Sequence, residues 1–306
     1  MFDPSHRPRQ PWSARVGPRV QLLGAAVLFG LTAAVVRLAS GSPGGLTGAQ
    51  TSAIRFCVGT AFSVLLFRLR PGTLRAVNRP MLVTRGALGG LAALLYFMAL
   101  ARIPAGRATL LNCLFPLMAT VLALVALRER PTVRLMVAIT ITSFGVFLVL
   151  GGGSLHLALG WGELAAVGSA VLAAGAITSI RVLRATDNAP TIFFAFCLGG
   201  MAMSVPLAGG PIPTTPTVWL LALLAALLSM GAQLLMTQAY GAVTVAEAAV
   251  WQQLTPIASF ASAAVILGES VTASGALGVL LGVVGVVYAT LSAVTHNGPN
   301  GCLPRR

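Results

Sequence analysis

Long apolar runs, separated by short polar or Gly- and Pro-containing segments, follow one another along almost the whole chain. A helical apolar run of about 20 residues is long enough to cross the hydrocarbon core of a membrane. The pattern predicts ten such spans, at 20–39, 47–67, 81–101, 105–127, 134–152, 160–180, 191–208, 217–239, 244–267 and 273–293. Because the breaks are short, neighbouring helices should run antiparallel. We therefore expect an all-α polytopic membrane protein.

The composition agrees with this pattern. Of the 306 residues 57% are hydrophobic and only 8% are charged, whereas a soluble domain carries roughly 25% charged residues. The basic N-terminus followed by an apolar run could be a cleaved signal peptide. The length of that run and the nine spans after it favour a retained first helix.

The basic residues, all of them arginine, indicate how the chain is oriented. They gather on alternate connections, as Arg68, Arg70, Arg75, Arg79 and Arg85, then Arg128, Arg130 and Arg134, then Arg181 and Arg184. The intervening connections at 41–46, 153–159 and 209–216 carry none. Cytoplasmic loops carry the excess of positive charge, so we expect both termini inside, with cytoplasmic tails at 1–19 and 294–306. The net charge of +14 then points to anionic lipid head groups and not to nucleic acid.

The two halves of the chain repeat each other. A shift of 140 positions without a gap aligns Pro116 with Pro256 and Glu129 with Glu269, although the whole chain has only 6 acidic residues. The halves at 20–152 and 160–293 each hold five predicted helices, an odd number, so they must enter the membrane in opposite senses. Inverted repeats of this kind build alternating-access transporters, with the substrate site at the repeat interface.

Two segments in register, 108–129 and 248–269, each contain a proline within the helix and a closing glutamate. With Arg55-Phe56 in the second span they resemble the EamA family of the drug/metabolite transporter (DMT) superfamily, although Arg128 replaces the glycine usual before the first closing glutamate. The resemblance implies ten transmembrane helices as two inverted five-helix repeats. It also implies export of small metabolites such as amino acids, and a cavity lined mainly by helices 1–4 and 6–9.

Arg55 is the charged residue that the pattern places deepest in a span. It lies about 12 Å from the start of its helix, where an arginine costs at least about 2.5–3.5 kcal/mol. One interpretation is a cavity-facing cation that meets a substrate carboxylate or orders the site through backbone carbonyls. The other is a structural arginine that pins helix ends. The sequence leaves both open.

Side-chain amides precede the two repeated prolines. Asn112 and Gln252 occupy the same repeat position, as do Cys113 and Gln253. A proline frees the carbonyl one turn earlier, and an amide beside such a kink can face a cavity or join two helices by a hydrogen bond. We favour the cavity for Gln252 and Gln253 and less so for Asn112. Such amides suit a neutral or zwitterionic ligand.

Four further polar or aromatic residues, Trp251, Tyr96, Gln233 and Gln238, lie on helices that the resemblance assigns to the cavity. Aromatic side chains there could stack on a substrate, but belts at the membrane interface are the more common explanation. We interpret Tyr240 as an interfacial anchor of this kind. The run of phenylalanines at 193–196 should face lipid or pack against neighbouring helices.

Three charged residues are candidates for coupling or gating: Glu247, Arg107 and Glu163. Arg107 and Glu247 are repeat mates on opposite sides of the membrane, so they should not pair. A surface acid stabilised by the helix dipole is the simpler interpretation of Glu247. Neither glutamate lies at mid-depth, so facilitated diffusion or exchange stands beside proton antiport.

These observations predict a secondary transporter of the inner membrane that exports small metabolites by alternating access. The alternatives are a receptor or scaffold without transport, and an exporter of drug-like compounds. The three histidines, His6, His156 and His296, fall in tails or a loop, so we expect neither an enzyme nor a metal or cofactor site. The expected partners are a small-molecule substrate and membrane lipid. The protein should be a monomer or a homodimer, since Gly278 and Gly282 could form a dimer contact or pack within one chain.

Overall fold

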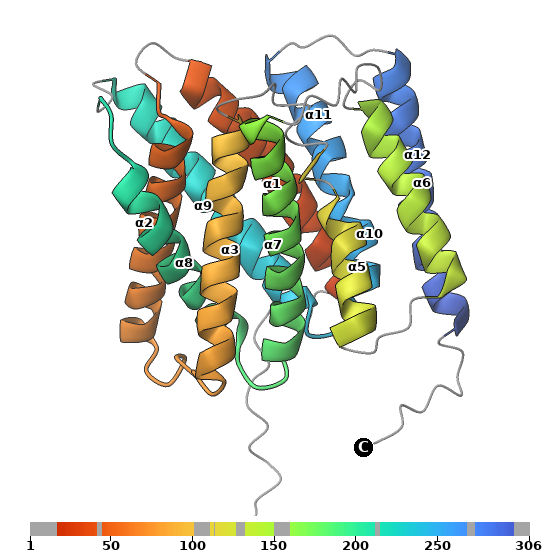
Figure 1. The fold of residues 1–306 in the computed structure, drawn as a ribbon, viewed down its shortest axis with the longest axis horizontal. Coiled ribbons are helices and arrows are strands. Elements are labelled where there is room, and N and C mark those ends of the chain that lie inside the picture. Colours follow the sequence, from red (N-terminus) through yellow and green to blue (C-terminus); the bar gives the residue numbers. More distant parts are fainter. Residues whose placement is uncertain are drawn as a thin grey trace, which may run out of the picture.

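The computed structural model describes residues 17–41, 45–100, 111–112, 114–126, 132–149, 160–211, 215–267 and 273–296. Every regular element in these ranges is helical (Figure 1). The helices are α1 (Pro18–Gly41), α2 (Gly48–Leu69), α3 (Arg79–Leu100), α5 (Phe115–Ala126), α6 (Val133–Val149), α7 (Trp161–Leu183), α8 (Ala189–Ser204) with the short η2 (Val205–Leu207), α9 (Pro216–Ala239), α10 (Val245–Gln252), α11 (Leu254–Leu267) and α12 (Ala273–His296).

Six of these helices are long and apolar enough to cross a membrane, namely α1, α2, α3, α7, α8 with η2, and α9. The protein is therefore a multi-pass membrane protein. The apolar parts of α6 and α12, Val133–Leu148 and Ala273–Tyr288, are shorter. The ninth predicted span is divided into α10 and α11, and the fourth lies partly outside the described residues. Ten membrane spans stay a prediction.

Side chains that bind backbone N–H groups fix where several helices begin. The Thr47 hydroxyl accepts a hydrogen bond from Gln50 N while the Gln50 amide accepts one from Thr47 N, so α2 starts with a complete capping box. Helices α8 and α10 have one half of this arrangement: the side chains of Asn188 and Thr244 each accept a hydrogen bond from a backbone N–H of the first turn. Each cap satisfies a backbone donor that the helix itself leaves free.

Equivalent helices of the two halves run in opposite directions. We call one end of the bundle the arginine-rich end, where the α2–α3 and α7–α8 connections lie (Figure 1). There α2 ends and its equivalent α8 begins. Helix α1 also begins at this end, where Arg19 binds Glu247 at the start of α10. Its equivalent α7 ends there, where Arg181 donates hydrogen bonds to the carbonyls of Tyr240 and Gly241 after α9. The repeat is therefore inverted.

The two halves pack against each other through their first and third helices: α1 packs on α9, and α3 packs on α7. Two similar contacts join these pairs, with leucines that are 140 positions apart and glycines that are 144 positions apart, one helical turn off the repeat. Leu235 of α9 lies over Gly24 of α1, and its repeat mate Leu95 of α3 lies over Gly168 of α7, each leucine 3.4 Å from where a glycine Cβ would stand. The first helix of each half thus packs against the third helix of the other.

Glycines bring two further helix pairs close together. Gly86 and Gly90 of α3 meet the backbone of α8 around Gly199, where an added Cβ would lie under 3 Å from backbone atoms. Gly145 of α6 meets the backbone of Gly278 and Gly282 on α12 in the same way. The glycine face of the last helix, which the sequence offered as a dimer contact, is thus occupied within the chain.

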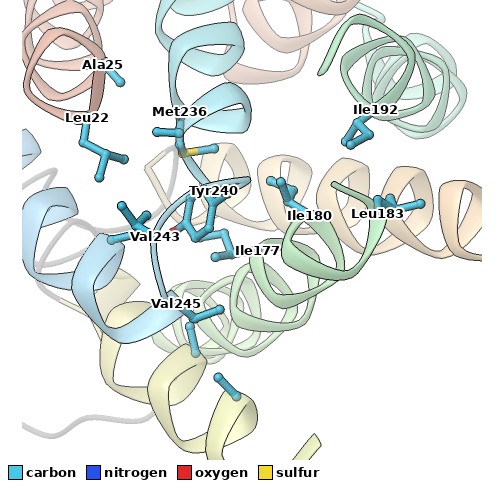
Figure 2. Packing of buried hydrophobic residues seen from close by; sticks show 14 of the residues in the cluster. Leu22, Ala25, Ile177, Ile180, Leu183, Ile192, Met236, Tyr240, Val243 and Val245 are labelled. Carbon is cyan, nitrogen blue, oxygen red and sulfur yellow. The ribbon is translucent and has the colours of Figure 1, made fainter. Parts of the chain in front are cut away.

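A large apolar cluster fills the arginine-rich end of the bundle between helices of both halves (Figure 2). Its larger members include Leu22, Ile177, Ile180, Leu183, Ile192, Met236, Tyr240, Val243 and Val245. Tyr240 is completely buried, so the expectation of an interfacial anchor was wrong. The ring is enclosed because α1, α7 and α10 meet where α9 ends.

Asp187 ties the two connections at this end together. This buried carboxylate accepts hydrogen bonds from Val77 N at 2.7 Å, Asn78 N at 3.2 Å and the Thr186 hydroxyl at 2.5 Å. Arg184 donates to the Asp187 backbone carbonyl, and burial lowers the pKa of Arg184 below its usual value. The α7–α8 connection is therefore a fixed support for the α2–α3 connection.

We expect Asp187→Ala to destabilise the protein, because it leaves two backbone donors without an acceptor at about 1–3 kcal/mol each. Thermal unfolding in detergent should show a lower Tm, with Asp187→Asn intermediate. Arg75→Ala is the control, since that side chain is exposed on the α2–α3 connection, which Asp187 supports. An Asp187→Ala variant as stable as the control would contradict the role given to the carboxylate.

Candidate functional site

A small pocket lies among α2, α8 and α9, and Arg55 is its charged residue. Its lining consists of Arg55, Phe56, Phe193, Phe196, Cys197, Ser229 and Met230. The pocket is closed, with too little room for a water molecule. In this conformation it therefore marks a place that would have to widen to admit a solute.

Aromatic rings surround the Arg55 guanidinium. Its Cζ lies 5.6 Å from the centroid of Phe56 and 5.8 Å from that of Phe196, and the two rings meet edge to face at 5.0 Å. Phe56 reaches this position over Gly200, where a Cβ would clash with the ring at 2.3 Å. The phenylalanines at 193 and 196 thus pack inside the bundle, one of the two alternatives that the sequence left open.

Arg85 is a residue of this region that the sequence did not indicate as functional. The charge pattern grouped it with the arginines of the connections, but it lies within α3 and is only 3% exposed. Its Cζ lies 4.3 Å from the Phe196 centroid, and its guanidinium occupies the space that a side chain at Gly89 would fill. Gly89, one turn further along α3, was the sequence feature that could have indicated a buried arginine, because it leaves room for the guanidinium.

The ninth predicted span breaks at Gln253, three residues before Pro256. Gln253 is 1% exposed, and its amide nitrogen donates to the Ser143 hydroxyl of α6 at 2.9 Å. The residues around the break contact α1, α5 and α6 of the first half. The interruption therefore lies where the two halves meet, which is where broken helices of transporters form their sites.

Asn112, the repeat mate of Gln252, also makes a bond between helices. Its amide donates to the Ser169 hydroxyl of α7 at 2.9 Å, and Ser169 donates in turn to the Ala92 carbonyl of α3 at 2.7 Å. Asn112 and Gln253 thus hold helices together in this conformation, which was the alternative to a cavity-facing role. Cys113 and Arg107 lie outside the described residues.

Three other predicted site residues carry buried donors that have no partner among the described residues: Gln233 Nε2, Gln252 Nε2 and Trp251 Nε1. Gln233 lies one turn beyond Ser229 of the pocket on α9, on the same helix face. Unpaired buried donors cost about 1–3 kcal/mol each, so these groups favour a conformation or ligand that satisfies them. Tyr96 and Gln238 are half-buried, and neither lines the pocket around Arg55.

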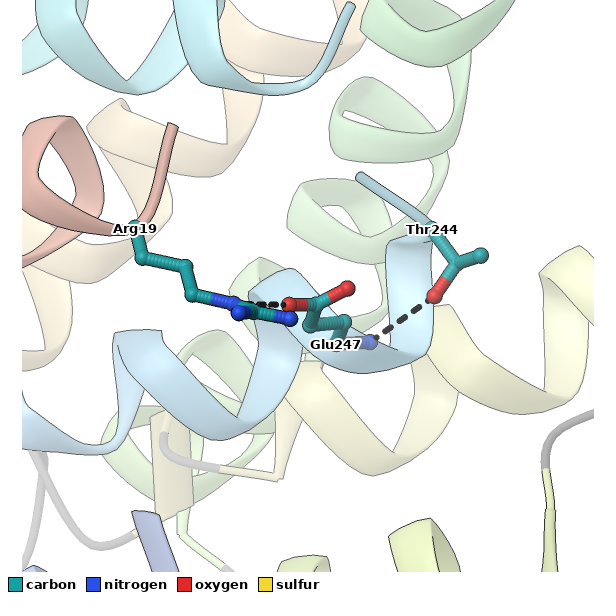
Figure 3. A network of polar contacts seen from close by, with 3 residues as sticks. All are labelled: Arg19, Thr244 and Glu247. Atoms are coloured by element: carbon teal, nitrogen blue, oxygen red, sulfur yellow. Dashed lines mark hydrogen bonds and ion pairs between the residues drawn. The ribbon is translucent and has the colours of Figure 1, made fainter. Parts of the chain in front are cut away.

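Glu247 forms an ion pair with Arg19 at 2.9 Å, between the starts of α10 and α1 (Figure 3). Thr244 caps the same turn by accepting from Glu247 N. The sequence treated Arg19 as part of a tail and Glu247 as a lone surface acid, so their pairing was not anticipated. Glu163 is buried and accepts from Gly160 N, which gives it a role at the start of α7.

The described residues contain no group of three His, Cys, Asp or Glu side chains that could hold a metal. The described residues form a helical membrane protein of two inverted halves, and one membrane helix is broken where the halves meet. Inverted halves of this kind are typical of membrane transporters.

The chain belongs to the EamA-like transporter family, whose model matches it twice, at residues 20–151 and 160–291. The double match confirms the two-repeat architecture and the resemblance seen in the sequence. The family is one of transporters and not of enzymes.

Known proteins agree with this assignment. The pseudopaline exporter CntI of Pseudomonas aeruginosa, in two strains, is 29% identical over 220 residues, which are 71% of this chain and 75% of that protein. A solved crystal structure that is 20% identical covers 92% of this chain and 100% of its own, with a TM-score of 0.75. The second similarity shows that the fold is shared.

We expect the Gln253–Ser143 bond to appear in a double-mutant cycle of Gln253→Leu and Ser143→Ala. Bonds of this kind between membrane helices are worth about 0.6 kcal/mol and at most about 1.7 kcal/mol, so the coupling should fall in that range. The measurement is the free energy of unfolding in bicelles. Thr140→Ala, exposed on the same helix, should show no coupling to Gln253. Strict additivity of Gln253→Leu and Ser143→Ala would argue against the bond.

Proposed function

We propose that the protein is a secondary transporter of the inner membrane that exports a small metabolite by alternating access. The observation that carries the proposal is the break at Gln253 where the inverted halves meet. Carriers use such interruptions because free backbone groups at mid-depth can bind a substrate only inside the protein. The relatives named as exporters support the outward direction.

The orientation follows the positive-inside rule. The arginine-rich end faces the cytoplasm, so both termini lie inside. The ten predicted spans and the wider set of site residues, from Arg55 to the amides around the break, belong to the same proposal. Amino acids and related compounds are the substrate class that the sequence predicts.

The cytoplasmic side is the one at which substrate enters an exporter. In this conformation the apolar cluster at the arginine-rich end fills the space between the halves, and the Arg19–Glu247 pair joins α1 of the first half to α10 of the second. Opening toward the cytoplasm requires both to separate. We propose that the ion pair is an inner gate and not a carrier of protons.

Counterflow in proteoliposomes tests the transport function directly. The panel consists of amino acids, nucleosides and cationic dyes, each assayed with and without a pH gradient. Accumulation of one solute class that Gln253→Ala reduces and Thr140→Ala does not would support a carrier with its site at the break. Folded protein that moves no solute from this panel or a wider one would favour the receptor or scaffold alternative. Flux of the dyes alone would favour the exporter of drug-like compounds.

If the Arg19–Glu247 ion pair is the inner gate, its removal should change the rate of transport modestly, and exchange of the two charges should reverse the change. Ion pairs open to solvent contribute about 0–1 kcal/mol, so Glu247→Gln or Arg19→Gln should change the counterflow rate by at most about fivefold. The exchanged pair, Arg19→Glu with Glu247→Arg, should restore the wild-type rate. Loss of every response to a pH gradient in Glu247→Gln, with counterflow retained, would instead identify Glu247 as the proton carrier.

A further inference from the structure

Two arginines lie inside the bundle without an acidic partner among the described residues. Arg85 is 3% exposed, its Nε has no hydrogen-bond partner, and Arg55 lines the pocket beside it. The three acidic side chains in the described ranges are engaged elsewhere: Glu163 at the start of α7, Asp187 between the connections, and Glu247 with Arg19. The buried positive charge is therefore uncompensated in this part of the chain.

The ring of Phe196 lies close to the guanidinium groups of both Arg55 and Arg85. The Cζ atoms of Arg55 and Arg85 lie 5.8 Å and 4.3 Å from the centroid of Phe196, so they are at most about 10 Å apart. Contact with a ring is worth about 0.5–2 kcal/mol, whereas a single arginine at this depth costs at least about 2.5–3.5 kcal/mol. The ring therefore does not offset the burial of two like charges, and a bound anion would.

The pair lies across the middle of the bundle. Arg55 is about 10 Å along α2 from the end opposite the arginine-rich end, and Arg85 is about 9 Å along α3 from the arginine-rich end. Phe196, on α8, lies between the two depths. Gln233 of α9, with its free amide donor, is about 9 Å from the arginine-rich end as well. Donors to an anion thus continue from the pocket toward the proposed cytoplasmic side.

We infer that Arg55 and Arg85, on either side of Phe196, bind a carboxylate of the transported solute, and that this solute is a net organic anion with an apolar part. The apolar part is suited to the rest of the pocket lining, which is Phe56, Phe193 and Met230 besides Phe196. A zwitterion or a cation is disfavoured because no carboxylate in the described residues faces the pocket to receive an ammonium group. The inference rests on the proposed transport function and narrows its substrate class from amino acids and related compounds to those that carry a net negative charge.

The test compares three solutes of similar size and different charge: N-acetyl-L-phenylalanine, an anion; L-phenylalanine, a zwitterion; and L-phenylalaninamide, a cation. Binding to the purified full-length protein in nanodiscs is measured by calorimetry. The variants are Arg55→Gln and Arg85→Gln, which remove charge, and Arg55→Lys and Arg85→Lys, which keep it. Arg68→Gln is the matched control, because that side chain is exposed in the last turn of α2.

We expect wild type to bind the anion and to prefer it over the other two solutes. Each Gln variant should weaken anion binding roughly tenfold or more, since a hydrogen bond to a charged group is worth about 1.5–3 kcal/mol. The Lys variants should recover part of this loss, and the control should bind as wild type does. Removal of an uncompensated buried charge should also leave Tm unchanged or higher, whereas a purely structural arginine would lower it.

The inference is overturned if wild type binds no anion, if it prefers the zwitterion or the cation, or if both Gln variants bind like wild type. The charge series on wild type decides even where a Gln variant fails to fold. Counterflow separates this failure from that of the transport function. Flux of phenylalanine or phenylalaninamide that both Gln variants retain would remove the anion site and keep the carrier. Anion binding without flux would remove the carrier and keep the site.

Discussion

The packing of the first and third helices of each half against those of the other half is the constraint on which the rest of the structure depends. Because α1 packs on α9 and α3 packs on α7, neither half can bury its own first and third helices. Between membrane helices there is no hydrophobic driving force, so close packing of small residues replaces it. The contacts of Leu235 with Gly24 and of Leu95 with Gly168 show that a leucine packs over a glycine in both helix pairs. In the proposed alternating-access mechanism, the interface that holds the fold together is also the one at which the substrate passes.

This interface concentrates the polar groups of the membrane region. The break at Gln253, the Asn112–Ser169 bond and the unpaired amide nitrogen of Gln252 all lie on helices that face the other half, among the described residues. Groups of this kind are tolerated at depth only where protein or a ligand satisfies them. Some of them hold helices together in this conformation, and others have no partner among the described residues. The same residues can serve packing in one conformation and binding in another.

Sequence reasoning predicted positions along the membrane normal better than directions around each helix. Runs of apolar residues located the six long helices, and the repeated prolines pointed to the break at Gln253. Lipid and protein interior are both apolar, so a membrane helix carries little sign of which face is buried. For that reason Arg85 was grouped with the connections and Tyr240 with the interface, although both are buried inside the bundle. Their burial depends on neighbours that are distant in sequence, as does the pairing of Arg19 with Glu247.

The proposed site, with two cations and no acid among the described residues, bears on how export could be driven. A proton antiporter needs a titratable group in the path, and the acids of the described residues lie at helix ends or in a connection. An anionic solute needs no such group, because an inside-negative membrane potential favours its exit by about 2.3 kcal/mol per unit charge for each 100 mV. The solute would itself supply the counter-charge for Arg55 and Arg85 while it is bound. Release on the outer side would then restore the unpaired arginines, whose cost of burial favours retention of the anion, so the membrane potential has to supply the free energy for release.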